Sequence, residues 1–312
     1  MPKPTAGPRP PRLSWLAVLV LWLVLPATGL TAAAGAVSVS DDRNRTVTLS
    51  EPAQRIVSLA PHLTELLFAI GAGDRIVATV AHADHPEAAR SIPRLGTAAQ
   101  LDLERLLAAS PDLVIAWGSG SPGAALERVE TLGIPVYYSE PGDFEGIAAN
   151  LRRLGRLAGQ PERGAREASA FLDAIATLRD RFADRPEVRV FYQVWDQPLM
   201  TVNDRHLIGQ AIRLCGGRNI FGHLDNRVPR PGLEAVIAAD PEAIVSGGPG
   251  EERADWLDGW RDWTQLTAVR RGNLFFIPPS LLQRHTPRLA EGTRMLCEAL
   301  ELARKRRPEP SR

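Results

Sequence analysis

An internal repeat limits the possible folds of this chain more than any other feature. Residues 101–120 read LDLERLLAASPDLVIAWGSG, and residues 231–250 read PGLEAVIAADPEAIVSGGPG. Each copy predicts a short amphipathic helix, a proline that ends it, an apolar strand and a glycine-rich turn, because the residue before proline avoids the helical region. A helix–strand unit that occurs twice predicts two similar lobes, and a groove between lobes can hold a ligand. The shared positions are Leu103/Leu233, Glu104/Glu234, Ala108/Ala238, Ala109/Ala239, Pro111/Pro241, Gly118/Gly248 and Gly120/Gly250.

Short apolar strands alternate with helical patterns along the rest of the chain, which favours parallel sheets covered by helices. Residues 163–183 form a helical run of about 30 Å that is the natural connector between the lobes. We therefore expect an α/β fold with two similar lobes, each with a mostly parallel sheet flanked by helices, joined by one long helix. The expected boundaries are a signal peptide at 1–34, an N-terminal lobe at 37–160, a connecting helix at 161–187, a C-terminal lobe at 188–305 and a tail at 306–312.

The first residues have the pattern of a secretory signal peptide. Lys3, Arg9 and Arg12 precede an apolar run at 13–25, and small residues at 31–34 suit cleavage. The apolar run is shorter than the roughly 20 residues of a membrane span, although an uncleaved anchor stays an alternative. No cysteine lies near the cleavage region, which argues against a lipid anchor. The mature chain is thus expected in an exported compartment.

The composition and motifs favour binding over catalysis. The net charge is +1, from 37 basic and 36 acidic residues, so no strong field indicates nucleic acid as a partner. The chain lacks a G-x-S-x-G elbow, an H-E-x-x-H zinc motif, a Walker A loop and a dinucleotide fingerprint. A secreted hydrolase is the alternative from a different class, and no cofactor is expected.

The chain has two cysteines, Cys215 and Cys297. Disulfides persist in exported compartments, so we expect the two to be bonded. Closing a loop of this length would stabilise the fold by about 4 kcal/mol in the chain-entropy model. The alternative is a pair of buried free thiols.

Several ordered motifs resemble a known family. Residues 55–71 read RIVSLAPHLTELLFAIG, and later motifs include LERLL at 103–107, LGIP at 132–135 and LCGGRNIF at 214–221. The set, spread over about residues 53–303, resembles the periplasmic substrate-binding proteins of ABC importers for vitamin B12, haem and iron-siderophores. The resemblance implies a class III-type periplasmic binding protein, a monomer that captures a ligand between two lobes and delivers it to a membrane permease. The likeness is greatest to the cobalamin-binding members, whose cysteine positions match Cys215 and Cys297.

The resemblance also implies ligand-binding positions. Pro61, Trp117 and Arg284 match the family pattern, whereas Met200 replaces an aromatic residue, His82 a tyrosine, and Ala98 and Arg230 tryptophans. The implied ligand is a corrinoid, with cobalamin first and haem or a ferric siderophore as alternatives. A metal-ion receptor of the same architecture ranks third.

Two tryptophans are candidates by their own position. Trp117 ends a predicted strand, and ligands of open α/β sheets bind outside strand carboxyl ends. Trp195 lies in a loop that follows a predicted strand, and it is a candidate ligand contact for the same reason. His62, His82 and His85 could together hold a metal ion or haem iron, but their spacing matches no closed metal site, so polar loop histidines are the preferred interpretation.

Glu104 and Glu234 form the repeat-related acidic pair. In the family, a surface glutamate on each lobe docks onto arginines of the permease, and symmetric carboxylates suit a two-fold partner. Glu127 and Glu130 are nearby substitutes in the first lobe. The alternative is that these are solvated helix charges.

Overall fold

Two four-stranded sheets, one in each half of the chain, form the framework of the protein in this computed structural model. The structure describes residues 1–3, 7, 35–97, 100–248, 250–252 and 255–308. The chain divides into two units, Met1–Ala34 and Gly35–Arg312, and the second carries the helices and strands described below. The predicted signal peptide at 1–34 lies almost wholly outside the described residues. No helix within the described ranges is both long and apolar enough to cross a bilayer.

The N-terminal lobe contains an antiparallel hairpin and a parallel sheet with the strand order β4-β3-β5-β6. The strands are β1 (Val37–Ser40), β2 (Thr46–Leu49), β3 (Ile56–Ser58), β4 (Ile76–Ala78), β5 (Leu113–Trp117) and β6 (Val136–Ser139). The helices are α1 (Pro61–Ala69), α2 (Leu103–Ala108), α3 (Gly123–Thr131) and α4 (Phe144–Leu157), with 3-10 turns at Gly73–Arg75 and Glu87–Ser91.

The C-terminal lobe contains a second parallel sheet with the strand order β10-β9-β7-β8. The strands are β7 (Val188–Gln193), β8 (Gly217–Asn219), β9 (Ala243–Ser246) and β10 (Leu274–Phe276). The helices are α6 (Leu207–Leu214), α7 (Leu233–Ala239), α8 (Asp255–Asp258), α9 (Thr267–Arg270), α10 (Pro279–Leu282) and α11 (Leu289–Lys305). In both sheets the first strand lies between the second and the third, and the fourth lies beyond the third. The two lobes share one topology, which confirms the predicted α/β fold.

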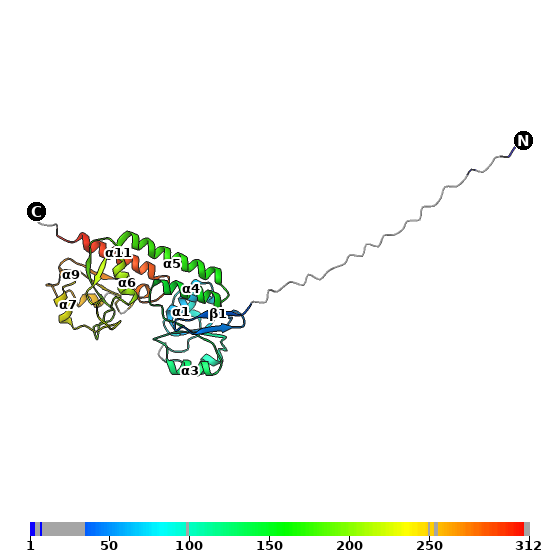
Figure 1. Ribbon diagram of the computed structural model, residues 1–312, viewed down its shortest axis with the longest axis horizontal. Coiled ribbons are helices and arrows are strands. Elements are labelled where there is room, and N and C mark those ends of the chain that lie inside the picture. The colour runs from blue at the N-terminus through cyan, green and yellow to red at the C-terminus, as the bar shows by residue number, and fades with distance from the viewer. Residues whose placement is uncertain (4–6, 8–34, 98–99, 249, 253–254, 309–312) are drawn as a thin grey trace. The chain divides into compact units, whose positions relative to one another are not determined.

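A continuous apolar core joins the two lobes. Helix α5 (Pro161–Phe182) has 22 residues and is about 33 Å long. It begins at a proline, whose missing N–H costs nothing at the first helical position. Its buried residues follow at helical spacing, packing the helix on α4 and α11, and Figure 1 shows α5 and α11 side by side. They are Gly164, Ala168, Phe171, Ile175, Leu178 and Phe182. Since one buried cluster runs from Leu63 through Leu151 and Phe171 to Tyr192, the lobes are coupled by packing as well as by a linker.

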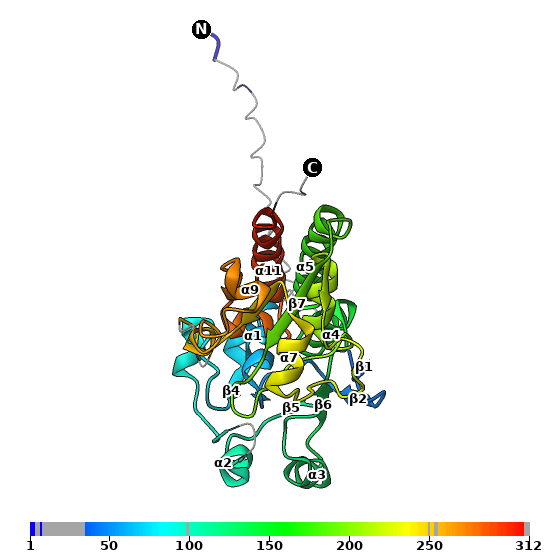
Figure 2. The same ribbon diagram turned by 90° about the vertical axis from the view of Figure 1, so that its left-hand side faces the viewer.

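The two cysteines form the expected disulfide. Cys215 caps the end of α6, Cys297 lies in α11, and both are fully buried. The bond therefore ties the last helix to the interior of the C-terminal lobe. Figure 2 shows α11 and α5 together at the upper end of the molecule, away from α2 and α3.

The repeat is confirmed as a repeated structure. Helix α2 precedes β5 in the first lobe, and α7 precedes β9 in the second. The link between helix and strand passes through the left-handed region at the same position of both copies, with φ of 45° at Ser110 and 41° at Asp240. Each residue precedes a proline, so right-handed helix cannot continue there. The carboxylate of Asp240 stabilises its turn by accepting from the N–H and the hydroxyl of Thr267, each at 2.7 Å.

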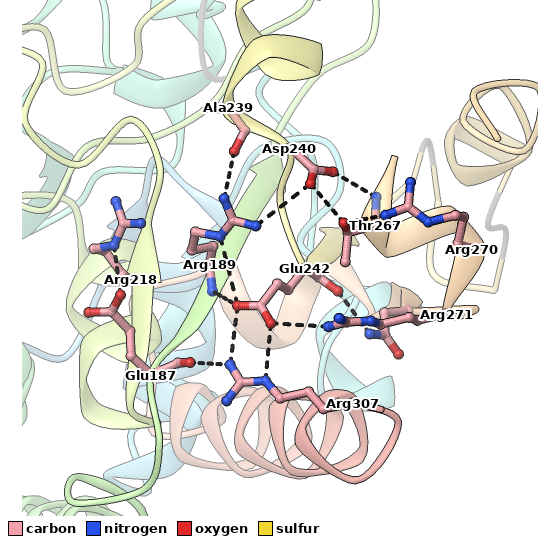
Figure 3. Close-up of polar contacts among 11 residues, drawn as sticks. Glu187, Arg189, Arg218, Ala239, Asp240, Glu242, Thr267, Arg270, Arg271 and Arg307 are labelled. Carbon is pink, nitrogen blue, oxygen red and sulfur yellow. Dashed lines mark hydrogen bonds and ion pairs between the residues drawn. The ribbon is translucent and has the colours of Figure 1, made fainter. Parts of the chain in front are cut away.

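A carboxylate also anchors each copy at the amino end of the first strand of its sheet. Asp112 accepts from the N–H of Arg55 at 3.0 Å, and Glu242 accepts from the N–H of Arg189 at 3.2 Å. Around Glu242 the network continues with Arg307, two residues beyond the end of α11, and with Arg271 in the β9–β10 connection (Figure 3). Burial alone would raise the pKa of Glu242, but hydrogen bonds from Arg189 and Arg307 hold it below its usual range. These contacts fix the amino ends of the strands, opposite the ends that face the cleft.

Candidate ligand-binding cleft

A cavity of about 780 Å³ lies between the two lobes, within the usual size range of small-molecule sites. Its N-terminal wall comes from Asp42, Arg43, residues 117–119 and residues 140–142. Its C-terminal wall comes from Val194, residues 206–208, residues 227–228, Gln283 and His285.

The cleft lies where the sheet topology directs a ligand. Residues 117–119 follow β5, residues 140–142 follow β6, and Val194 follows β7, so the cavity is bounded by strand carboxyl ends from both sheets. In each sheet the second and third strands lie on opposite sides of the first strand, so the loops that follow neighbouring strands turn away from each other. Such a topological switch point leaves a crevice outside the carboxyl ends of the strands. Two copies of one topology thus place two crevices toward one cavity.

Trp117 supplies the aromatic surface of the N-terminal wall. It is the last residue of β5, half-buried, and its indole N–H has no partner among the described residues. A Cβ at Gly120 would come within 1.9 Å of this indole, so only glycine lets the ring lie across its own turn. The ring also meets the imidazole of His62 edge-on, with centroids 5.4 Å apart. Contacts with His62 and with the turn at Gly120 therefore hold the indole in place while it lines the cavity.

Three histidines from different segments meet beside Trp117. The ring centroids of His62 and His285 are 5.6 Å apart, and those of His285 and His206 are 6.4 Å apart. His62 lies in α1, where it is 6% exposed, whereas His206 and His285 line the cavity. Burial lowers the pKa of all three. His285 lowers the pKa of His62 and of His206 further, with smaller contributions from Arg284 and Arg227 respectively. For His285 itself the carboxylate of Glu140 partly opposes the effect of burial on the pKa. Near neutral pH these imidazoles are consequently uncharged.

His206 has a defined hydrogen-bonding role. It is the N-cap of α6, and its Nδ1 accepts from the N–H of Ile208 at 3.1 Å. Burial lowers the pKa of His206 to about 4, with further contributions from His285 and Arg227. A neutral imidazole whose Nδ1 is an acceptor carries its proton on Nε2. His206 is thus a hydrogen-bond donor at the cavity wall.

The polar groups of the N-terminal wall satisfy one another. Glu140 accepts from the N–H of Ser119 at 2.7 Å and from its hydroxyl at 3.1 Å. Asp42 accepts from the N–H of Glu140 at 2.7 Å and pairs with Arg153. Arg43 donates to the carbonyl of Gly118 at 2.6 Å. This wall carries two carboxylates that are already bonded.

An ionic contact between the lobes positions the segment that carries His285. Glu65 in α1 is 4% exposed and accepts from Arg284 at 2.6 Å and from Arg288 at 3.4 Å. Arg284 also pairs with Asp84 at 3.0 Å. Because both arginines come from the C-terminal lobe, residues 284–288 are held against the N-terminal lobe. A second link joins Gln210 of α6 to the carbonyl of Gly142 at 2.8 Å.

Among the predicted ligand-binding residues Pro61, Trp117 and Arg284, Trp117 is the one that lines this cavity. Pro61 starts α1 directly before His62. Arg284 is engaged with Glu65 and Asp84, and it donates to the carbonyl of His82 at 3.2 Å. These residues stay predicted ligand contacts.

The other predicted positions lie farther along the C-terminal lobe. Trp195 pairs with Met200 in an isolated bridge, and its ring, 52% exposed, meets that of Trp256 edge-on. Arg230 is exposed beyond the cavity-lining residues 227–228. Ala98 lies outside the described residues.

The other predicted groups can be located as well. Glu104 and Glu234 are exposed in the first turns of α2 and α7, as their repeat relationship requires. Within the described residues no group of three or more His, Cys, Asp or Glu side chains has an arrangement suited to a metal ion. His62 is buried beside the cleft, whereas His85 lines a separate hollow with Glu65 and Arg288.

Of the residues that line this cavity, Trp117 alone was predicted as a ligand contact from the sequence. The polar residues Glu140, His206, Arg227 and His285 are among those that were not predicted. His285 follows Arg284 directly, and that adjacency was the one available signal for it. His206, Arg227 and Glu140 sit in loops whose local sequence has no distinctive pattern.

Comparison with known proteins places these observations in context. A family model described as periplasmic binding protein matches residues 56–281. A vitamin B12-binding protein of Vibrio campbellii is 34% identical over 258 residues, which are 82% of this chain and 92% of the relative. A vitamin B12-binding protein of Yersinia pestis is 34% identical over 80% of this chain and 88% of the relative.

Solved structures show the same architecture. The periplasmic vitamin B12-binding protein BtuF of Vibrio cholerae superposes with a TM-score of 0.75 at 33% identity, covering 81% of this chain and 99% of that structure. The periplasmic haem-binding protein RhuT of Roseiflexus superposes with a TM-score of 0.72 at 25% identity, covering 80% and 99%. The cleft described above thus occurs in a fold shared with proteins named for the binding of vitamin B12 and of haem.

Proposed function

The chain belongs to the periplasmic binding protein family, and we propose that it captures cobalamin in the cleft between its lobes and delivers it to an ABC importer. The observation that carries the proposal is the cavity of about 780 Å³ at two facing strand ends, with Trp117 on one wall. A flat indole offers a large apolar face to a macrocycle at little entropic cost. The relatives named as vitamin B12-binding proteins support the same ligand.

The mode of action is binding without chemistry. Family membership supports a solute-binding role rather than that of a secreted hydrolase, and we propose that no resident cofactor is required. Affinity would come from apolar contact with Trp117, Leu207 and Ile208 and from a few polar groups. Since packing couples the lobes through α4 and α5, we expect only a small lobe movement to accompany binding and release.

The partners and location follow from the family. Its members are the substrate-binding components of ABC importers, so we place the mature chain in the periplasm, as a monomer that meets a permease in the inner membrane. We propose that Glu104 and Glu234 dock onto that permease. Both are exposed, and they come from equivalent helices of the two lobes, which supports recognition by a two-fold partner.

A titration of the purified protein with cobalamin, haem and a ferric siderophore tests the ligand. We expect cobalamin to quench tryptophan fluorescence and to release heat at sub-micromolar ligand, because an indole lines the cleft. Binding of haem or siderophore with higher affinity than cobalamin would overturn the proposal.

Haem is the second candidate ligand, because two histidines line the cleft. Imidazole is a frequent axial ligand of haem iron, and His285 and His206 line the cleft. In His206 the nitrogen free of protein contacts carries the proton, so His285 is the better candidate to coordinate iron. A shift of the haem absorption band that His285→Gln abolishes would support haem over cobalamin.

A further inference from the structure

Two hydrogen-bond donors on the C-terminal wall of the cavity have no acceptor among the described residues. The Nε2–H of His206 makes no hydrogen bond with the described residues, and the guanidinium of Arg227 makes neither a hydrogen bond nor an ion pair with them. The arginines of the opposite region differ, since Arg43, Arg153 and Arg284 are all bonded to protein oxygens. Arg227 is therefore the cation in the cavity lining that is left available to a ligand.

The backbone brings these two side chains together. The N–H of Thr201 donates to the carbonyl of Pro229 at 3.0 Å, and the N–H of Asn203 donates to the carbonyl of Arg227 at 3.0 Å. The side chain of Asn203 then accepts from the N–H of His206 at 3.2 Å and donates to the carbonyl of Leu224 at 2.9 Å. The loop before α6 and the loop before α7 thus form one paired unit. Their closeness is also seen in the influence of Arg227 on the pKa of His206.

The two walls of the cavity differ in what they can bind. The N-terminal wall carries the carboxylates of Glu140 and Asp42, which repel an anion, and the guanidinium of Arg43 on the same wall is already bonded to the carbonyl of Gly118. The C-terminal wall carries a neutral imidazole donor beside an exposed guanidinium, with the first turn of α6 just behind them. An arginine fork matches two oxygens of a phosphate, and hydrogen bonds to a charged acceptor are the stronger kind. An anionic group of the ligand is thus expected at the C-terminal wall.

We propose that His206 and Arg227 form a subsite for the phosphodiester of the nucleotide side chain of cobalamin. This inference rests on the proposed function and adds to it the basis of a preference among corrinoids. Cobalamin carries one phosphodiester, with two oxygens available as acceptors, and cobinamide lacks the nucleotide and this phosphate. The subsite therefore selects complete cobalamin over its truncated form, while Trp117 contacts both.

Affinity measurements with the two corrinoids test the subsite. Arg227→Gln removes the charge at an exposed position and should weaken cobalamin binding roughly tenfold, in keeping with a hydrogen bond to a charged group. The same change should leave the affinity for cobinamide as it was. His206→Asn keeps an N-cap acceptor for α6 and removes the Nε2 donor, so it should also weaken cobalamin selectively. The matched control is Arg166→Gln, which removes a charge from the exposed face of α5.

A double variant and a salt series complete the test. If both side chains hold one phosphate, the loss in Arg227→Gln/His206→Asn should be smaller than the product of the two single losses. The affinity of the wild-type protein for cobalamin should fall with rising salt, and that dependence should be weaker in Arg227→Gln. Near neutral pH the unfolding midpoints of these variants should match the wild type, because the guanidinium of Arg227 has no bond to the described residues and asparagine at 206 still offers an N-cap acceptor to Ile208.

The outcomes separate this inference from the proposed function. Equal losses for cobalamin and cobinamide would mean that Arg227 contacts the corrin ring, and no loss for either would mean that it contacts solvent. Either result overturns the subsite while cobalamin binding stands. A wild-type protein that binds neither corrinoid would reject the proposed function and the subsite with it.

Discussion

The carboxylate of Glu65 in the N-terminal lobe lies 2.6 Å from Nη1 of Arg284 in the C-terminal lobe. The pair is 219 residues apart in the chain, and Glu65 is almost completely buried. Arg288 contacts the same carboxylate at 3.4 Å. The contact holds the segment of His285 at the cleft, so an ion pair outside the cavity determines part of its lining.

Replacing Glu65 by glutamine should destabilise the protein. It leaves two arginines of the opposite lobe without their buried partner, and removal of one member of such a pair costs about 3 kcal/mol. The measurement is the urea midpoint of unfolding. Glu104→Gln removes an exposed carboxylate and should leave the midpoint as it is. Equal midpoints for the two variants would show that the interlobe pair adds no stability.

Loss of the disulfide should lower the free energy of unfolding. The bond joins residues 82 apart, and in the chain-entropy model closing such a loop stabilises the fold by about 4 kcal/mol. The variant Cys215→Ser/Cys297→Ser should therefore unfold at lower denaturant. Reducing agent should shift the wild-type protein by a similar amount and leave the double variant unaffected. A shift of the double variant by reductant would contradict the assignment.

Acidification should destabilise the protein through its buried histidines. The pKa of His206 is lowered to about 4 by burial, and the pKa values of His62 and His285 are lowered from 6.5 as well. Between the folded and unfolded pKa values the unfolded chain binds more protons, so stability rises with pH there and is complete above about 6.5. Each such histidine adds up to about 1.4 kcal/mol per pH unit to the slope of the free energy of unfolding against pH.

Unfolding experiments between about pH 7 and pH 5 measure this slope. The carboxylates of Asp240 and Glu242, whose pKa values are lowered from 3.8 and 4.5, add their effect at more acidic pH. His206→Asn should reduce the slope in the histidine window. A slope that is identical in this variant would show that His206 does not titrate as its burial requires.

Trp117→Ala should weaken ligand binding by about 1 kcal/mol or more, because the indole loses its stacking contact with the ligand. The same change should remove most of the fluorescence quenching on titration. Trp263→Ala is the matched control, since its ring packs on a buried cluster of the C-terminal lobe and does not line the cleft. Unchanged affinity in Trp117→Ala would assign the indole to packing against His62.

Reversing the charge of Glu104 and Glu234 together should spare ligand binding and weaken association with the permease. Both side chains are exposed on equivalent helices, and electrostatic contacts of this kind set orientation and on-rate. The measurement is binding of the Glu104→Lys/Glu234→Lys variant to permease in detergent or nanodiscs. Asp173→Lys, on the exposed face of α5, serves as the control. Normal permease binding by the double variant would reject the docking surface.

Local periodicity was enough to predict the architecture. Apolar runs, helix-ending prolines and the repeat around Pro111 and Pro241 specify elements through contacts within a few residues of one another. Two copies of one unit also predicted two lobes and the cleft between them. For the same reason Trp117 could be placed at a strand end and then at the cavity wall.

Only the tertiary structure decided which polar side chains meet. His62, His206 and His285 come from three separate segments, and Arg227 joins them through a loop pairing with Asn203. Likewise, nothing near Arg284 in the sequence indicates that its partner is Glu65. Elements are specified by neighbours along the chain, whereas a binding site is assembled from loops whose relative positions depend on the packing of the whole fold.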